Sequence, residues 1–302
     1  MKNDGIIFDI SRFCQSDGPG IRTTIFLKGC PLNCIWCHNP ESQHIKPEIM
    51  YSKKACIHCA KCVDVCKNRC HTIKDTHVFN RTLCDECGEC VKVCPSKALE
   101  YVGRYCSAEE IIAEAVKDKV YYEESGGGIT VSGGEPMMQI DFLETLLTLA
   151  KKEKLHTCIE TCGYAKKCDF EKIAPLVDCF LYDFKESNNE KHCLFTGVDN
   201  HLILENLALL NSIGSMIILR VPLIPGYNDT YEHMKGIAAV VNKHKCIKKI
   251  EIMPYHALGV SKAEAIGRNN IESVIPVPDN VFLKQYTSEL AEKVSVEIEV
   301  MF

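Results

Sequence analysis

The stretch Cys30-Pro31-Leu32-Asn33-Cys34-Ile35-Trp36-Cys37 decides the fold, because it places three cysteines in one short loop. The apolar residues Ile25, Phe26 and Leu27 precede it within residues 21–28, so we expect a strand that leads into the loop. A 4Fe–4S cluster usually takes four cysteine thiolates. Three close cysteines without an evident fourth therefore predict a cluster with one iron open to an outside ligand.

Cysteine is unusually frequent, at twenty of 302 residues, and eleven of the twenty fall in three regular groups between positions 30 and 94. In a reducing compartment this grouping favours metal or redox sites over disulfides. Structural zinc is the alternative, but zinc sites usually combine two CxxC pairs, whereas triplets and quartets dominate here. We therefore favour iron–sulfur clusters.

Two four-cysteine runs follow the first loop and repeat with a period of 28 residues. Each has the ferredoxin spacing, in which three cysteines hold one 4Fe–4S cluster and the fourth crosses to the other. This rule predicts two ligand sets, namely Cys56, Cys59, Cys62 with Cys94, and Cys84, Cys87, Cys90 with Cys66. The first run has Lys67 in place of the usual proline and an additional Cys70, which we interpret as a spare thiol.

The chain divides into a ferredoxin-like insert at 52–103 and a main domain made of 1–51 and 104–302. In the main domain, we expect strands at 21–28, 128–132, 157–161, 179–183, 217–221 and 250–254, and a last one at 294–302. Helical patterns lie between them, from a capping box at Ser107 and over 138–152, 202–212, 230–244 and the stretch with Phe282, Tyr286 and Leu290. The alternation predicts an α/β fold with a parallel sheet. A doubly wound open sheet is one such architecture.

Polar residues follow the expected strands, at the edge where parallel sheets bind ligands. Gly133 and Gly134 allow backbone to approach a ligand closely, and Glu135 can accept hydrogen bonds from an ammonium group. Asp183 and Lys185 point to the same side of an extended strand, where they form a ligand pair or an ordinary surface ion pair.

The loop resembles the CxxxCxxC loop of the radical S-adenosylmethionine (SAM) enzymes, in which SAM chelates the open iron. Residues 17–22 and 36–42 narrow the resemblance to the activating enzymes of glycyl radical enzymes, and the resemblance extends to position 256. It implies a partial six-stranded (β/α)6 TIM-like barrel, with the two-cluster insert in the first βα connection. It also implies three 4Fe–4S clusters, of which one binds SAM.

The resemblance implies an enzyme that reductively cleaves SAM and takes a hydrogen atom from a backbone glycine of a partner glycyl radical enzyme. A low-potential donor, flavodoxin or ferredoxin, would supply the electron through the insert clusters. Two alternatives remain open, a radical SAM enzyme that acts on a small molecule or peptide and a ferredoxin-type electron-transfer protein. Nothing in the sequence identifies the particular partner.

By the same resemblance, Cys30, Cys34 and Cys37 hold the catalytic cluster. The implied SAM contacts are Trp36, Cys37, His38, Gly133, Gly134, Glu135, Asp183, Phe184, Lys185, Arg220 and His256. Arg220 is either a contact for the SAM carboxylate or a buried salt-bridged arginine. In some relatives, positions that match Glu160, Thr161 and Asp183 hold a monovalent cation, although the glutamate replaces the usual aspartate.

Bulk properties exclude several other classes of protein. The net charge of −5 provides no basic field for nucleic acid. No stretch has the roughly 18 apolar residues of a membrane span, and residues 1–7 lack a secretory apolar region. We therefore expect a cytoplasmic protein.

Overall fold

The computed structural model describes residues 4–268 and 274–301, and in these ranges a sheet of nine strands occupies the centre. The strands are β1 (Gly5–Cys14), β2 (Arg22–Leu27), β7 (Arg104–Cys106), β8 (Gly128–Gly133), β9 (His156–Thr161), β10 (Cys179–Asp183), β11 (Ile217–Leu223), β12 (Ile247–Pro254) and β13 (Glu297–Val300). Their order across the sheet is β13-β12-β11-β10-β9-β8-β2-β1-β7. Neighbours from β2 to β13 are parallel, whereas β1 is antiparallel to both β2 and β7.

The predicted α/β class with a mostly parallel sheet is confirmed. The six expected strands of the main domain correspond to β2 and β8–β12, and each lies beside the next one along the chain. A doubly wound sheet would reverse its strand order at a switch point. The order found here has no reversal, so the carboxyl ends of six consecutive parallel strands meet along one edge.

Strand β1 is absent from the strands expected from the sequence, of which the first is at 21–28. The strand has little of the alternation that marks a half-buried strand, because Asp9, Ser11 and Arg12 interrupt its apolar residues. Strand β1 pairs with β2, which follows it, and with β7, which is far away in the sequence. No local sequence pattern encodes the long-range pairing with β7.

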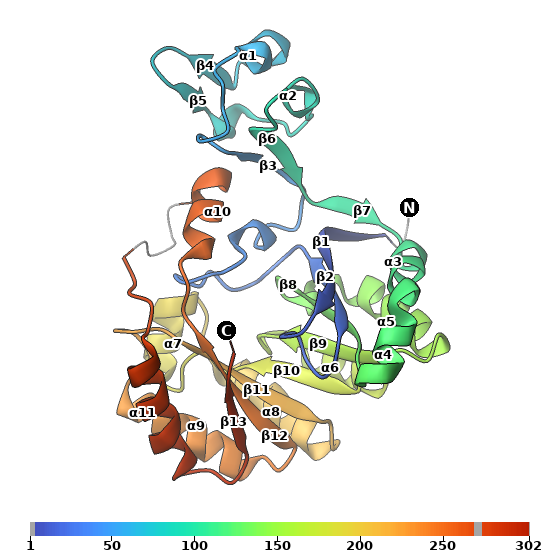
Figure 1. Cartoon of the computed structure of the whole chain (residues 1–302), viewed down its shortest axis with the longest axis vertical. Helices are drawn as coiled ribbons and strands as arrows, with labels where there is room; N and C mark the ends of the chain where they lie inside the picture. The colour runs from blue at the N-terminus through green and yellow to red at the C-terminus, as the bar shows by residue number, and fades with distance from the viewer. Residues whose placement is uncertain (1–3, 269–273, 302) are drawn as a thin grey trace.

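Helices lie along the outside of this sheet, except for α10, which lies beside the stem of the small lobe at residues 48–102 (Figure 1). They are α3 (Ala108–Ala115), α4 (Lys119–Ser125), α5 (Ile140–Lys152), α6 (Lys167–Ile173), α7 (Asn189–Thr196), α8 (His201–Ser212), α9 (Tyr231–Lys243), α10 (Leu258–Ile266) and α11 (Asn280–Ala291). The predicted capping box is confirmed, since Ser107 Oγ accepts from the Glu110 N–H and the Glu110 carboxylate accepts from the Ser107 N–H. In α5, Leu143, Leu146 and Leu147 are fully buried, as the helical period predicts.

Residues 48–102 form a small lobe that projects from the main domain (Figure 1). Its elements are β3 (Glu48–Tyr51), α1 (Lys61–Val65), β4 (His71–Ile73), β5 (His77–Phe79), α2 (Glu89–Lys92) and β6 (Leu99–Val102). Antiparallel pairing of β3 with β6 makes its stem. Its core is small, and the buried cysteines Cys62 and Cys90 belong to it.

A buried charge network joins the stem of the small lobe to the cysteine loop. Lys28, which lies two residues before Cys30 and is fully buried, donates from Nζ to Glu48 Oε2 at 3.1 Å and to the Glu41 carbonyl at 2.6 Å. Arg268 contacts the same Glu48 carboxylate at 3.1 Å. Glu48 therefore neutralises two cations that belong to the main domain.

In the described part of the chain, none of the helices has the length and apolar character that crossing a bilayer requires.

Candidate functional site

A cavity lies at the carboxyl ends of the parallel strands, where ligand sites of such sheets form. Its lining comes from the cysteine loop, from the last residues of β8, β9, β10, β11 and β12, and from the residues that follow β8, β9 and β10. The lining includes Cys30, Cys34, Trp36, Cys37, His38, Ser132, Gly133, Gly134, Glu160, Cys162, Asp183, Lys185, Pro222 and Met253. The structure thus brings most of the residues expected to contact SAM into one space.

Backbone hydrogen bonds fix the cysteine loop on both sides. The Cys30 N–H donates to the Gln43 carbonyl at 3.0 Å, and the Ile35 N–H donates to the Phe195 carbonyl at 3.0 Å. Trp36 is buried, and its ring packs 5.5 Å from the Phe195 ring. Helix α7 therefore holds the loop from outside while the three thiols line the cavity.

The surroundings of the loop thiols disfavour the charged thiolate, so a neighbouring positive charge is needed for ionisation. Burial raises the pKa of Cys34 far above its ordinary value and raises that of Cys37 to about 11, while the Lys185 ammonium opposes the shift at both thiols. A hydrogen bond from the Cys162 thiol lowers the pKa of Cys30. Metal binding would ionise all three, because the thiolate is the ligand form.

Glu135 is fully buried beside the cavity. Its carboxylate accepts from Thr161 Oγ1 at 2.8 Å and from the Cys162 N–H at 2.8 Å. Burial raises the pKa of Glu135. The carboxylate is therefore fixed in place by the last residue of β9 and by the residue that follows it.

The two glycines before Glu135 serve backbone packing as well as the cavity. A Cβ on Gly134 would lie 2.1 Å from the Gly29 carbonyl oxygen, and Gly133 has a φ of +107°. The close approach permits hydrogen bonds from the Gly134 N–H to the Leu27 carbonyl at 2.9 Å and from the Glu135 N–H to the Gly29 carbonyl at 2.7 Å. Sequence reasoning assigned the glycines to ligand approach, whereas their direct contact is with the end of β2.

Asp183 and Lys185 form a pair at the end of β10, with Nζ and Oδ2 2.8 Å apart and both side chains largely buried. Burial disfavours the Lys185 ammonium, but Asp183 and Cys34 outweigh this cost and leave the pKa of Lys185 raised. Phe184, between them, is buried and stacks on His233 instead. Lys185 therefore supplies a fixed positive charge beside the cysteine loop.

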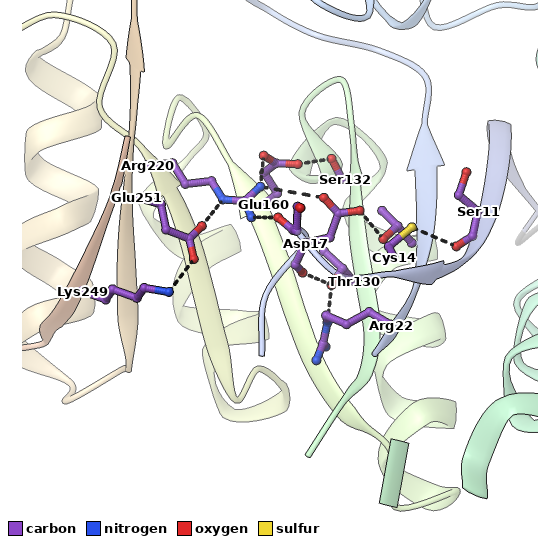
Figure 2. Close-up of polar contacts among 12 residues, drawn as sticks. Ser11, Cys14, Asp17, Arg22, Thr130, Ser132, Glu160, Arg220, Lys249 and Glu251 are labelled. Atoms are coloured by element: carbon purple, nitrogen blue, oxygen red, sulfur yellow. Dashed lines mark hydrogen bonds and ion pairs between the residues drawn. The ribbon is translucent and has the colours of Figure 1, made fainter. Parts of the chain in front are cut away.

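Arg220 occupies a buried charge network beneath the cavity (Figure 2). Its Nη1 donates to Glu160 Oε1 at 2.6 Å, its Nε donates to Glu251 Oε2 at 3.0 Å, and its Nη2 donates to the Ser16 carbonyl. Ser132 Oγ donates to the other Glu160 oxygen. The guanidinium thus has protein partners on all three of its nitrogens, as in a buried salt-bridged arginine.

Two histidines stack at the rim of the cavity. The rings of His38 and His256 have their centroids 3.8 Å apart with an interplanar angle of 27°. Burial lowers the pKa of His38 to about 3, so its ring is neutral at neutral pH. His38 Nε2 is buried without a hydrogen-bond partner among the described residues, which leaves it able to bind a polar ligand group.

The first predicted insert site is a small cavity in the small lobe. Cys56, Cys59 and Cys62 line it together with Cys94 from the second run, 32 residues after Cys62. The structure therefore brings together the four cysteines that the ferredoxin rule assigns to one cluster.

Around the second predicted site, burial and the neighbouring Cys84 and Cys66 raise the pKa of Cys90 to about 11. Cys70 lies against the same group. Its N–H donates to Cys66 Sγ at 3.2 Å, and burial with the Cys66 thiol raises its pKa to about 12. Cys70 is thus buried, as a spare buried thiol would be, and it lies next to the second set.

Sequence reasoning missed three residues that contact the predicted ligands. Cys162 lines the main cavity, and His71 and His77 lie beside Cys62 in the small lobe. The position of Cys162, directly after β9, was a usable signal, because strand ends face the cavity. The two histidines gave no comparable signal, since their approach depends on the fold of the lobe.

Comparison with known proteins identifies the family of the chain. The family model of the radical SAM superfamily matches residues 24–237. The chain is 42% identical to the trans-4-hydroxy-L-proline dehydratase activating enzyme of Clostridioides difficile, over 86% of this chain and 87% of that protein. It is 40% identical to the choline trimethylamine-lyase activating enzyme of Oleidesulfovibrio alaskensis, over 88% of each.

Among solved structures, a domain of the pyruvate-formate lyase-activating enzyme from Bacteroides vulgatus superposes with a TM-score of 0.50 at 22% identity. The superposition covers 58% of this chain and 99% of that chain. At this identity the likeness concerns the fold alone.

Replacing Arg220 with methionine tests whether this residue is structural. We expect Arg220→Met to lower the free energy of unfolding by about 3–5 kcal/mol, because Glu160 and Glu251 keep their buried charges without a partner. The matched control is Lys249→Met, which removes a more exposed partner of Glu251 and should cost at most about 1 kcal/mol. The measurement is anaerobic chemical denaturation, and an unchanged stability with lost ligand affinity would contradict the structural role.

Proposed function

We propose that this chain, which belongs to the radical SAM superfamily and within it to the activating enzymes of glycyl radical enzymes, binds SAM in the cavity beside Cys30, Cys34 and Cys37. The enzyme uses SAM to take a hydrogen atom from a backbone glycine of a partner protein. The observation that carries the site assignment is the meeting of three loop thiols with the buried Lys185–Asp183 pair in one cavity.

The residues present fit the cofactors of this family. Three thiols in one loop suit three irons of a 4Fe–4S cluster and leave the fourth iron for SAM. His38 Nε2, which is buried without a hydrogen-bond partner among the described residues, can bind a polar group of the nucleoside. When bound, cluster and SAM together supply the reductive cleavage that yields methionine and a 5′-deoxyadenosyl radical.

The chain's own residues bind and orient SAM in this proposal. Glu135 accepts from the amino group of the methionine part, and Lys185 and Asp183 hold the carboxylate and a ribose hydroxyl. Gly133 and Gly134 keep the Glu135 segment close to the cysteine loop. Buried surfaces around these groups exclude water, which strengthens each charged contact.

The supporting contacts come from the remaining predicted residues. His256 stacks on His38 and limits the space for the adenine, while Trp36 and Phe184 are packed against other aromatic rings and support the loops they belong to. Arg220 contributes indirectly, because its ion pair fixes the position of Glu160.

A monovalent cation is not included in the proposal, because its expected ligands are engaged. Glu160 accepts from Arg220 and from Ser132, and Thr161 Oγ1 donates to Glu135. The Arg220 guanidinium already supplies a positive charge at Glu160.

We further propose that residues 52–103 hold two accessory 4Fe–4S clusters, on Cys56, Cys59, Cys62 with Cys94 and on Cys84, Cys87, Cys90 with Cys66. The shared cavity of the first four cysteines supports this assignment. Residues 1–51 and 104–302 then form the SAM domain, and the consecutive order of β2 and β8–β12 supports a partial six-stranded barrel. A flavodoxin or ferredoxin would deliver electrons through the accessory clusters.

Electron paramagnetic resonance tests the activity directly. Anaerobic mixing of the reduced enzyme with SAM and a glycyl radical enzyme encoded nearby should produce a stable protein radical whose signal changes when the partner glycine is deuterated. A modified small molecule or peptide without a protein radical would instead identify a different radical SAM reaction. Failure to cleave SAM at all would favour an electron carrier.

Single cysteine variants separate the three cluster sites. We expect Cys34→Ala to abolish formation of 5′-deoxyadenosine, because the catalytic cluster loses one of its three protein ligands. Cys87→Ala should slow formation or lower the stability of the enzyme, and the exposed Cys168→Ala, which is in no predicted set, should match the wild type. The readout is chromatography of the nucleoside products, and wild-type turnover by Cys34→Ala would overturn the site assignment.

Removal of iron should unfold the small lobe before the main domain. The lobe buries few apolar side chains, so metal binding must supply much of its folding free energy. Chelation of the intact enzyme should therefore raise amide hydrogen exchange across 52–103 while β8–β11 stay protected. Equal protection of the lobe with and without iron would contradict this expectation.

A further inference from the structure

The hairpin β4–β5, which joins the two cysteine runs, carries two buried histidines at the start of its strands. His71 is 2% exposed and His77 is 5% exposed. Both lie beside the first set of insert cysteines, and neither has a place in the function proposed above. Buried imidazoles need polar partners, and here those partners include sulfur atoms that we assign to a cluster.

The ring of His77 contacts two of these sulfurs with its two nitrogens. Nδ1 lies 3.4 Å from Cys56 Sγ, and Nε2 lies 3.7 Å from Cys62 Sγ. Nε2 also lies 3.0 Å from Nδ1 of His71, which is the shortest of the three contacts. Tyr51 packs on the same ring with centroids 4.4 Å apart, and Phe79 stacks on His71 at 4.5 Å. Both imidazoles are therefore held in fixed orientations.

The contact between the histidines determines which nitrogen of His77 carries hydrogen. One hydrogen lies between His71 Nδ1 and His77 Nε2, because two nitrogens at this distance form one hydrogen bond. If His71 supplies it, the hydrogen of a neutral His77 lies on Nδ1, against Cys56 Sγ. Cys56 Sγ is the nearer sulfur, at 3.4 Å from Nδ1, whereas Cys62 Sγ is 3.7 Å from Nε2, which the His71 hydrogen already occupies. A hydrogen on Nδ1 therefore relieves the closer contact between a ring lone pair and a thiolate. With His71 as the donor to Nε2, His77 is in the tautomer that donates from Nδ1 to Cys56.

The second cysteine run lacks this arrangement. With the period of 28 residues, Leu99 occupies the repeat position of His71 and Ala98 that of Cys70. Leu99 is 2% exposed and lines the first cluster cavity as an apolar wall. The hydrogen-bonding histidine pair therefore follows only the first of the two cysteine runs. Hydrogen bonds to cluster sulfurs are one of the means by which a protein sets reduction potential.

Accepting the accessory clusters of the proposed function, we propose that His77 donates a hydrogen bond from Nδ1 to the Cys56 thiolate, with His71 fixing its tautomer. This bond raises the reduction potential of the first insert cluster. His77 is a positioning and tuning residue, since it acts through a ligand and not on substrate. The two accessory clusters are consequently unequal, and the reduced insert holds its electron preferentially on the cluster with the histidine pair.

Nitrogen-15 labelling of histidine in the reconstituted full-length enzyme tests the hydrogen bond without any variant. Pulsed paramagnetic resonance of the reduced insert clusters should detect a weak 15N coupling, as expected for a nitrogen one hydrogen bond away from the cluster. A strong coupling would make a histidine an iron ligand, and the absence of any coupling would remove the hydrogen bond. Either result overturns the proposal.

A redox titration of variants tests the effect on potential. His77→Phe keeps an aromatic ring without a donor and should shift one accessory cluster to a more negative potential, while the other keeps its value. His77→Asn restores an N–H near the position of Nδ1 and should recover most of the shift. The control is His201→Asn, which changes an exposed histidine on α8 of the main domain.

Iron content and SAM cleavage driven by a chemical reductant are measured on the same samples. Two wild-type-like potentials in His77→Phe, with full iron content, would overturn the tuning role and leave the proposed function intact. Missing insert iron in the wild-type enzyme would instead overturn the cluster assignment on which the inference rests.

Discussion

Two backbone hydrogen bonds between the ends of β2 and β8 hold the candidate site together. They run from Gly134 to the Leu27 carbonyl and from Glu135 to the Gly29 carbonyl, at 2.9 and 2.7 Å. Neither can form unless the backbones approach so closely that a side chain on Gly134 would collide with Gly29. The cysteine loop and the Glu135 carboxylate are therefore placed by the same parallel pairing that builds the sheet. The positions of these two groups therefore depend on the register between β2 and β8.

A second constraint is the balance of charge around the cavity. Lys185 lies beside Asp183 and Cys34 inside it, and Arg220 lies beneath it between Glu160 and Glu251. Each buried cation has a carboxylate within hydrogen-bonding distance, which limits the desolvation cost of placing charges at the end of a sheet. Lys185 follows the end of β10 and Arg220 lies in the adjacent β11, so this part of the sheet carries positive charge where a metal cluster of thiolates would add negative charge.

Sequence patterns predicted much of this arrangement because they are local. Strand β10 was predicted to its terminal residues, since its apolar run ends abruptly at Asp183. Spacing alone also predicted that Cys94 lies with Cys56, Cys59 and Cys62, which line one cavity. The patterns did not predict hydrogen bonds between segments that are distant in the sequence, such as those of Arg220 with Ser16, Glu160 and Glu251. The hairpin histidines were missed for the same reason, because their relation to Cys56 depends on how the lobe folds.

Glu48 at the stem of the small lobe limits how the chain can be shortened. Its carboxylate is the charge partner of Lys28, which is wholly enclosed and lies two residues before the first cysteine of the loop. A shortened chain that lacked residues 48–102 would leave the Lys28 ammonium beside the cysteine loop with only the Glu41 carbonyl as a hydrogen-bond acceptor. Removal of the lobe should therefore keep Glu48 or replace Lys28.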